Sequence, residues 1–277
     1  MKALFVGRGP FSKVLQKILL AVAPGAGITE IGKTDAESAV ASFDYDTLFL
    51  VCPPQAHVQL LPLAWARGKS AWVEKPFGAS HVDAEHLVAE WTWHGSPPCY
   101  VDFPHLRLPI VEKFQFTFPL LNFFAVVGGP GPSRPYMSNL WDWGAHVAAM
   151  FVYAGGVKSE WRREDFTLVE ERALSSKFIL GKLKTRLVAY RLAGLDRANE
   201  PFMLSIWDDW RDLPTEIQPL TKAMGEMVDG HPRTHPNWSP KFAAQVTELL
   251  EAFGPCATPR NNENAQIAHP LATVRQL

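Results

Sequence analysis

The feature that most constrains the fold of this 277-residue chain is a regular alternation of short apolar runs with helical segments over its N-terminal third. Runs typical of buried strands occupy residues 2–6, 28–31, 46–52, 70–73 and 99–103. Segments with helical spacing lie between them, at 12–22, 36–43, 57–68 and 81–93. Strands that alternate with helices in this way form βαβ crossovers, which require a parallel sheet. We therefore predict a doubly wound α/β domain over residues 1–103.

A different pattern begins near Lys113. Phe114, Phe116 and Phe118 alternate as in a strand, and further strands are predicted at 170–172, 177–180 and 185–190. Apolar periodicity also predicts helices at 141–154, 217–228 and 240–253. We therefore predict that residues 104–277 form an α+β domain with an open, mostly antiparallel sheet, which ends in an arm of little periodicity from residue 254.

Charge and cysteine content exclude several classes of protein. Lys and Arg number 27 and Asp and Glu number 28, so the formal net charge is -1. A chain without a positive field is not expected to bind nucleic acid or an anionic membrane. The cysteines have neither the pairing of a secreted scaffold nor metal-binding spacing, and the apolar run at residues 3–6 is too short for a signal peptide. These features predict a cytoplasmic protein; the three cysteines are Cys52, Cys99 and Cys256.

A glycine turn follows the first predicted strand, in the segment Gly7-Arg-Gly-Pro-Phe-Ser12. It fits the GxGxxG fingerprint of Rossmann-like domains, except that a serine replaces the third glycine, where a small residue is enough for close packing of the helix. The first glycine permits the turn, and the second lets a pyrophosphate approach the backbone at the helix N-terminus. We predict that this segment binds a dinucleotide through Gly7, Gly9, Pro10, Phe11 and Ser12.

The second predicted strand lacks an acidic residue at its end, where dehydrogenases that use NAD bind the ribose hydroxyls. Gly32, Lys33 and Thr34 follow that strand instead. Lys33 and Thr34 can accept a 2′-phosphate through charge and hydrogen bonding, which favours NADP, with NAD as the alternative. In that alternative, Asp35 or Glu37 binds the ribose after a small shift of the strand boundary.

Four further segments carry a resemblance to a known family. They are Val51-Cys-Pro-Pro-Gln-Ala-His57, Ala64-Trp-Ala-Arg-Gly-Lys69, Ala71-Trp-Val-Glu-Lys-Pro-Phe77 and Asp142-Trp-Gly-Ala-His146. In this order they resemble the glucose-fructose oxidoreductase, inositol dehydrogenase and MocA (Gfo/Idh/MocA) family, because the EKP and DxGxH motifs together are a specific combination. The resemblance implies an NAD(P)-dependent dehydrogenase or reductase that acts on a hydroxyl or carbonyl carbon of a small, sugar-like or cyclic polyol substrate.

The resemblance also implies roles for individual residues. Lys75 polarises the substrate oxygen and His146 is the acid/base, although the two roles can be exchanged, and Asp142 orients the imidazole from one helical turn away. Glu74 and Lys75 can alternatively form a solvated ion pair, and His146 can be a core histidine. Cofactor contacts are further implied for the loops that follow two strands, through Cys52, Pro53, Pro54, His57, Glu74, Lys75 and Pro76. His57 can instead cap the helix that follows it.

Other predictions are less specific. Trp141 and Trp143 flank Asp142 and are candidates for an apolar wall of the substrate site. His231 and His235 lack a third ligand nearby, so no metal site is predicted. The second-domain sheet, through the alternation at 114–118, predicts a homodimer or homotetramer.

Relative to the family, the chain is shortened between residues 35 and 45, where a strand and a helix are usually found. The adenine side of the sheet is therefore expected to be abbreviated, and the substrate cannot be inherited from the resemblance. Two alternative functions remain open: a dinucleotide-binding relative without catalytic activity, and a reductase of an imine or tetrapyrrole.

Overall fold

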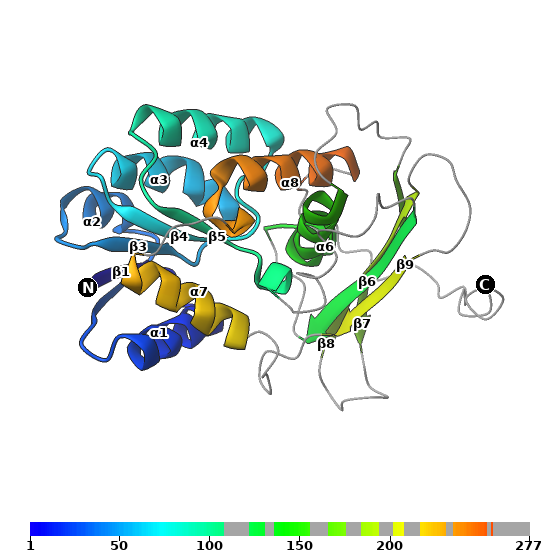
Figure 1. The fold of residues 1–277 in the computed structure, drawn as a ribbon, viewed down its shortest axis with the longest axis horizontal. Coiled ribbons are helices and arrows are strands. Elements are labelled where there is room, and N and C mark those ends of the chain that lie inside the picture. Colours follow the sequence, from blue (N-terminus) through cyan, green and yellow to red (C-terminus); the bar gives the residue numbers. More distant parts are fainter. Residues whose placement is uncertain are drawn as a thin grey trace.

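The computed structural model describes residues 1–107, 122–130, 136–155, 166–175, 184–193, 202–207, 217–230, 235–253 and 256. Two sheets organise these residues (Figure 1). The N-terminal sheet is parallel and lies between two layers of helices, while the second sheet lies at the other end of the molecule, beyond helix α6 (Asn139–Gly155). This arrangement confirms the predicted Rossmann-like, doubly wound domain followed by an α+β region.

Five parallel strands of the described chain form the first sheet, in the order β2-β1-β3-β4-β5. Their bounds are β1 (Lys2–Val6), β2 (Gly27–Ile31), β3 (Thr47–Leu50), β4 (Ser70–Glu74) and β5 (Cys99–Asp102). All five predicted strands are confirmed to within a few residues. β2 is the edge strand, and no described strand lies beyond it.

The helices of this domain follow the same order as the prediction. They are α1 (Pro10–Val22), α2 (Ala36–Ser42), α3 (His57–Trp65) and α4 (His81–Trp93), with the short 3-10 helices η1 (Pro54–Ala56) and η2 (Pro104–Arg107). Pro10 is the first residue of α1, a position where the missing N–H removes no helical hydrogen bond. Ser80 caps α4 by accepting a hydrogen bond from the Asp83 N–H. These local signals explain why both helices begin where they do.

One face of the parallel sheet carries a row of aromatic rings. Phe5, Phe49, Trp72 and Tyr100 are register partners on β1, β3, β4 and β5, and all four are fully buried. The Phe5 and Phe49 rings stack at 4.3 Å between centroids, and the Trp72 and Tyr100 rings lie 4.1 Å apart. Helices α1 and α7 (Ile217–Asp229) cover this face (Figure 1). The row buries a large apolar area with little loss of side-chain entropy, since each ring has only two rotatable bonds.

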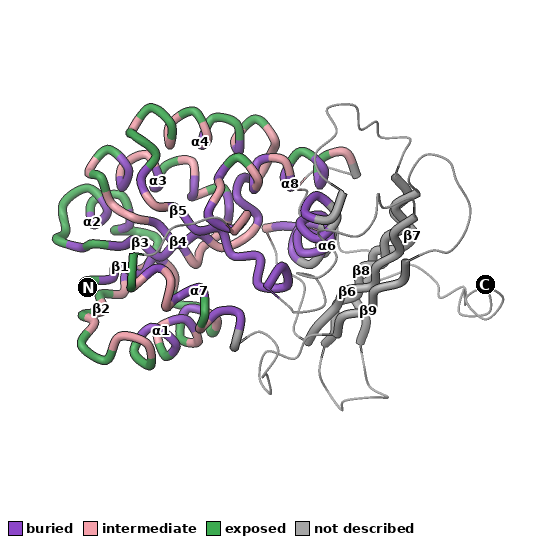
Figure 2. Tube along the Cα trace, in the orientation of Figure 1, coloured by how far each residue is buried: buried purple, intermediate pink, exposed green. Residues whose placement is uncertain are grey.

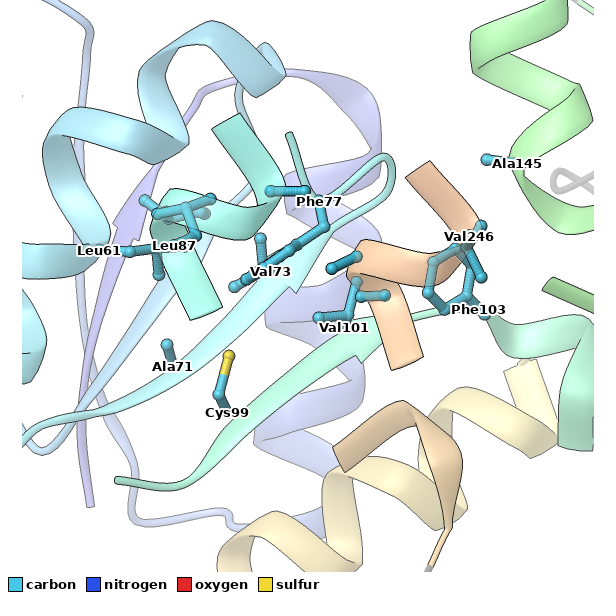
Figure 3. Close-up of a cluster of buried hydrophobic side chains, with 14 of the residues drawn as sticks. Leu61, Ala71, Val73, Phe77, Leu87, Cys99, Val101, Phe103, Ala145 and Val246 are labelled. Atoms are coloured by element: carbon cyan, nitrogen blue, oxygen red, sulfur yellow. The ribbon is translucent and has the colours of Figure 1, made fainter. Parts of the chain in front are cut away.

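The opposite face is aliphatic and supports the largest core cluster of the described residues. Ala71, Val73, Cys99 and Val101 point from β4 and β5 toward α3, α4 and α8 (Pro240–Phe253), as Figure 3 shows. Burial is nearly continuous through β1, β3, β4 and β5, whereas β2 and the outer surfaces of the helices are partly exposed (Figure 2). Because both faces of those four strands are covered, their sequences are almost uninterrupted apolar runs.

The second sheet has the order β7-β8-β6-β9 among the described strands. The bounds are β6 (Asn122–Pro130), β7 (Phe166–Ser175), β8 (Lys184–Ala193) and β9 (Phe202–Trp207). The β7–β8 and β8–β6 pairings are antiparallel and the β6–β9 pairing is parallel, which confirms an open, mostly antiparallel sheet. Strands β6 and β9 were not predicted. The alternation at 114–118 and the strand predicted at 177–180 lie outside the described residues.

Two helices from the C-terminal half return to the parallel sheet. α7 packs against α1, and α8 packs against α4 and α6. These two helices come from residues 104–277 but complete the helical layers around the first sheet. The boundary between two domains at residue 103 therefore stays a prediction. No helix in the described part of the chain is both long and apolar enough to cross a membrane.

Candidate active site

The carboxyl ends of the parallel strands carry most of the residues that the sequence singles out. The glycine turn follows β1, Cys52 to Pro54 follow β3, Lys75 and Pro76 follow β4, and His105 in η2 follows β5. In an open parallel sheet, ligands bind along this edge, because strand ends, loops and helix N-termini meet there.

Gly7 is required by the geometry of the turn. Its φ is +122°, and a Cβ atom at this position would lie 2.0 Å from the Val51 carbonyl oxygen, so no side chain fits. Gly9, in contrast, has no described atom within 4 Å of where its Cβ would be, and the N-cap that it provides for α1 has no side-chain hydrogen bond. Ser12 is fully buried. The turn therefore brings backbone close to the sheet while leaving the N-terminal side of α1 open at Gly9.

The loop after β3 is held by a buried histidine. His57 begins α3 and is fully buried, with Nδ1 3.0 Å from the Phe77 carbonyl oxygen and Nε2 3.2 Å from the Cys52 carbonyl oxygen. Burial lowers the pKa of His57 to about 4, although both carbonyl contacts act in the opposite direction. His57 thus connects the loop after β3 to the loop after β4 through its buried ring. These contacts indicate a structural role, and its predicted roles as a cofactor contact or a helix cap stay predictions.

Lys75 and Asp142 form a buried ion pair. Lys75 Nζ donates to Asp142 Oδ1 at 3.0 Å and also to the Asp142 backbone carbonyl, and the two side chains are 10% and 2% exposed. The pair joins the end of β4 to the first turn of α6. A solvated ion pair between Glu74 and Lys75 is therefore not the main partnership of this lysine. The Lys75–Pro76 peptide bond is cis, and Pro76 is buried.

His146 lies one helical turn after Asp142 on α6 and is 4% exposed. Its ring makes an edge contact with the ring of His105, with 4.2 Å between centroids. His105 was not singled out by the sequence; its signal was only its place a few residues after β5. Arg107, which ends η2, forms a bidentate ion pair with Glu226 of α7, with N–O distances of 2.8 and 2.6 Å. This pair fixes the short helix that carries His105.

Lys33 and Thr34 are exposed just beyond the end of β2, as predicted. They belong to a turn in which the Ala36 N–H donates to the Lys33 carbonyl oxygen at 3.4 Å. Arg8, which the sequence prediction left out, lies against the neighbouring Gly32. The signal that could have identified Arg8 is a cation between the two glycines combined with the missing acid after β2.

Of the two tryptophans that flank Asp142, only the side chain of Trp141 lies among the described residues. Trp141 is fully buried and belongs to the large core cluster, which favours a packing role over contact with a substrate. The side chain of Trp143 lies outside the described residues, as does His231. The cysteines are free thiols; burial raises the pKa of Cys52 to about 12 and of Cys256 to about 11, so neither is a reactive thiolate.

No protein-family model matches the chain, and no curated protein sequence matches it significantly. Solved structures do resemble it. A putative oxidoreductase from Magnetospirillum magnetotacticum superposes with a TM-score of 0.60 at 17% identity, covering 92% of this chain and 99% of the other. For scyllo-inositol dehydrogenase from Lactobacillus casei with bound NAD(H) and scyllo-inositol, the TM-score is 0.60 at 12% identity, covering 91% and 95%.

A third similar structure is an oxidoreductase from Agrobacterium radiobacter in complex with NAD⁺, L-tartaric acid and magnesium. Its TM-score is 0.57 at 15% identity, with 91% of this chain and 95% of the other covered. These likenesses extend over both sheets. They establish that the chain has the two-part fold of these oxidoreductases, which is the fold that the sequence resemblance implied.

Proposed function

We propose that the chain is a member of the Gfo/Idh/MocA family: an NAD(P)-dependent oxidoreductase that transfers a hydride between nicotinamide and a hydroxyl or carbonyl carbon of a small polyol or sugar-like substrate. The observation that carries this proposal is the buried Lys75–Asp142 ion pair, with His146 one turn further along the same helix. A lysine held at the end of a parallel strand, with an imidazole nearby, suits the movement of a proton to or from a substrate oxygen.

The residues at the strand ends fit a dinucleotide. At Gly7 a side chain would collide with Val51, and at Gly9 the space beside the backbone is open. The pyrophosphate would be held by residues 7–12, and the loops at 52–54 and 74–76 would meet the nicotinamide half. When bound, the dinucleotide supplies the hydride chemistry, and the protein supplies position and proton transfer.

Each catalytic residue then has a task. The Lys75 ammonium donates a hydrogen bond to the substrate oxygen, which stabilises negative charge as a carbonyl is reduced or an alcohol is deprotonated. His146 gives or takes the proton. Asp142 holds the Lys75 ammonium in place through the 3.0 Å contact, and its position one turn before His146 suits it to orient the imidazole as well.

NADP is the preferred cofactor in this proposal, because Lys33 and Thr34 follow β2 where an acid would favour NAD. The similar structures with NAD(H) or NAD⁺ support a nicotinamide dinucleotide in general. Their ligands, scyllo-inositol and L-tartaric acid, are small polyhydroxylated molecules, which supports a substrate of that kind. A cytoplasmic location, supported by the free thiols, and a homodimer or homotetramer built through the second sheet complete the proposal.

The test is turnover of the full-length chain with NADP⁺ or NAD⁺ against a panel of cyclic polyols, aldoses and hydroxy acids, followed by cofactor absorbance. We expect at least one hydroxyl compound to reduce the cofactor. In Lys75→Met this turnover should be lost while dinucleotide binding is retained. Binding without turnover on any substrate would instead support the non-catalytic alternative. Turnover confined to imines or tetrapyrroles with NADPH would support the other reductase.

A further inference from the structure

The end of β2 lacks the usual means of binding an unphosphorylated ribose. β2 ends at Ile31, the register partner of Val6, and the next residue is Gly32. Glu30 is the acid nearest this end, but its carboxylate pairs with Lys13 of α1 and accepts a hydrogen bond from Gln16 at 3.1 Å. Glu30 is therefore committed to the packing of α1 on the sheet.

The Arg8 side chain lies beside the position from which an acidic side chain at residue 32 would project. A Cβ atom at position 32 would be 3.6 Å from the guanidinium carbon of Arg8 and 3.8 Å from its Nε and Nη1 atoms. Arg8 stands between the two glycines of the turn, so it reaches from the pyrophosphate loop across to the end of β2. The end of β2 therefore carries a positive side chain where an NAD site carries a negative one.

The end of β2 is also open to solvent. β2 is the edge of the described sheet, and Arg8, Lys33 and Thr34 are all exposed. The two nearby acids stand further along the chain: Asp35 is at the N-cap position of α2 and Glu37 is in its first turn. With no further strand beside β2 in the described chain, an adenosine bound here would depend on charge more than on packing.

We propose that Arg8 is the principal recognition residue for the 2′-phosphate of NADP, with Lys33 as a second cation. This inference rests on the proposed function, since it requires that residues 7–12 bind a dinucleotide. A guanidinium can form two parallel hydrogen bonds to a phosphate, whereas a lysine acts as a single point charge. Arg8 is thus a specificity residue, and its guanidinium lies beside Gly32 at the end of β2.

The first experiment measures dissociation constants of NADPH, NADH, 2′,5′-ADP and 5′-AMP by calorimetry on the full-length protein. For the wild type we expect NADPH to bind more tightly than NADH, and 2′,5′-ADP more tightly than 5′-AMP. Arg8→Ala should weaken NADPH and 2′,5′-ADP binding about 10- to 100-fold, as expected for loss of hydrogen bonds to a charged group, and leave NADH within about twofold. The affinity of Arg8→Lys for NADPH should lie between those of the wild type and Arg8→Ala. Lys17→Ala, which removes an exposed charge from α1, the helix that follows the turn, is the matched control and should change the binding of neither ligand.

A second variant reverses the preference. Gly32 does not have a positive φ, and its Cβ would make only ordinary contacts with Arg8, so Gly32→Asp is sterically allowed. Combined with Arg8→Ala, it should favour NADH over NADPH. Equal binding of the two dinucleotides by the wild type, or an Arg8→Ala variant that binds NADPH normally, would overturn this inference and leave the proposed function standing. Binding of neither dinucleotide would overturn both.

Discussion

The Lys75 ammonium and the Asp142 carboxylate, 67 residues apart in the chain, meet at 3.0 Å in a nearly solvent-free contact. This contact joins the end of β4 to the start of α6 and places His146 on the same helix. The ion pair thus connects the parallel sheet to α6, the helix that lies between the two sheets.

Lys75→Met tests this pair for both stability and chemistry. We expect loss of about 3–5 kcal/mol of unfolding free energy, because the Asp142 charge is left buried and unpaired. Turnover should fall about 100-fold or more with dinucleotide binding retained. Urea denaturation and steady-state kinetics give the two readouts. In the double variant Lys75→Met/Asp142→Asn, stability should recover and turnover should not; a double variant as active as the wild type would exclude a catalytic role for the pair.

Two glycine variants separate the turn from its ligand. Gly7→Ala places a Cβ atom 2.0 Å from the Val51 carbonyl oxygen at a φ of +122°, so we expect a lower melting temperature as well as loss of dinucleotide binding. Gly9→Ala faces open space and should fold normally while binding the dinucleotide more weakly. Thermal denaturation and NADPH titration measure both effects. Equal melting temperatures for the two variants would contradict the assignment of the steric constraint to Gly7.

Stability should depend on the protonation of His57. Its pKa in the folded protein is about 4, below the ordinary value of 6.5, so the unfolded chain binds the proton first. The contribution of His57 is therefore complete above pH 6.5 and is lost as the pH falls toward 4, a difference of about 3 kcal/mol. His235, with its pKa also lowered to about 4 by burial, acts in the same direction.

Urea denaturation across pH 4 to 7.5 measures this dependence. In His57→Gln the unfolding free energy should vary less steeply over this window, because one proton fewer is taken up on unfolding. The residual slope should come in part from His235. An unchanged slope in His57→Gln would show that His57 does not carry the linkage.

The Arg107–Glu226 pair should anchor η2 and, through it, His105. The Arg107 side chain is 1% exposed, and its guanidinium forms two hydrogen bonds with the carboxylate. Arg107→Met leaves Glu226, which is 29% exposed, with a hydrogen bond from Trp238 alone among its described partners, so we expect a loss of about 1–3 kcal/mol. Arg107→Met/Glu226→Met should be less destabilised than the single variant. If the two single effects simply add, the pair is not coupled.

The success of the sequence prediction varied with burial. Four strands of the first sheet, β1, β3, β4 and β5, were found because both of their faces are covered, which leaves near-continuous apolar runs that end in glycine, proline or charged residues. β6 and β9 were missed because Asn122–Pro130 and Phe202–Trp207 are mostly apolar runs without the alternation that marks a half-buried strand. The DxGxH and EKP motifs identified Lys75, Asp142 and His146 as candidates, but not which of them would touch.

Sequence alone determined the order of the strands and helices around the parallel sheet and the glycine turn, because these depend on local periodicity and on residue type. The candidate catalytic residues came from the resemblance of the EKP and DxGxH motifs to a known family. Tertiary structure decided the partners. That Asp142 pairs with Lys75, that His105 lies against His146 and that Arg8 covers Gly32 all depend on how loops from separate strands converge at one sheet edge. Such contacts leave no periodic trace in the sequence, since the distance between two side chains in space is set by packing of the whole fold rather than by their separation along the chain.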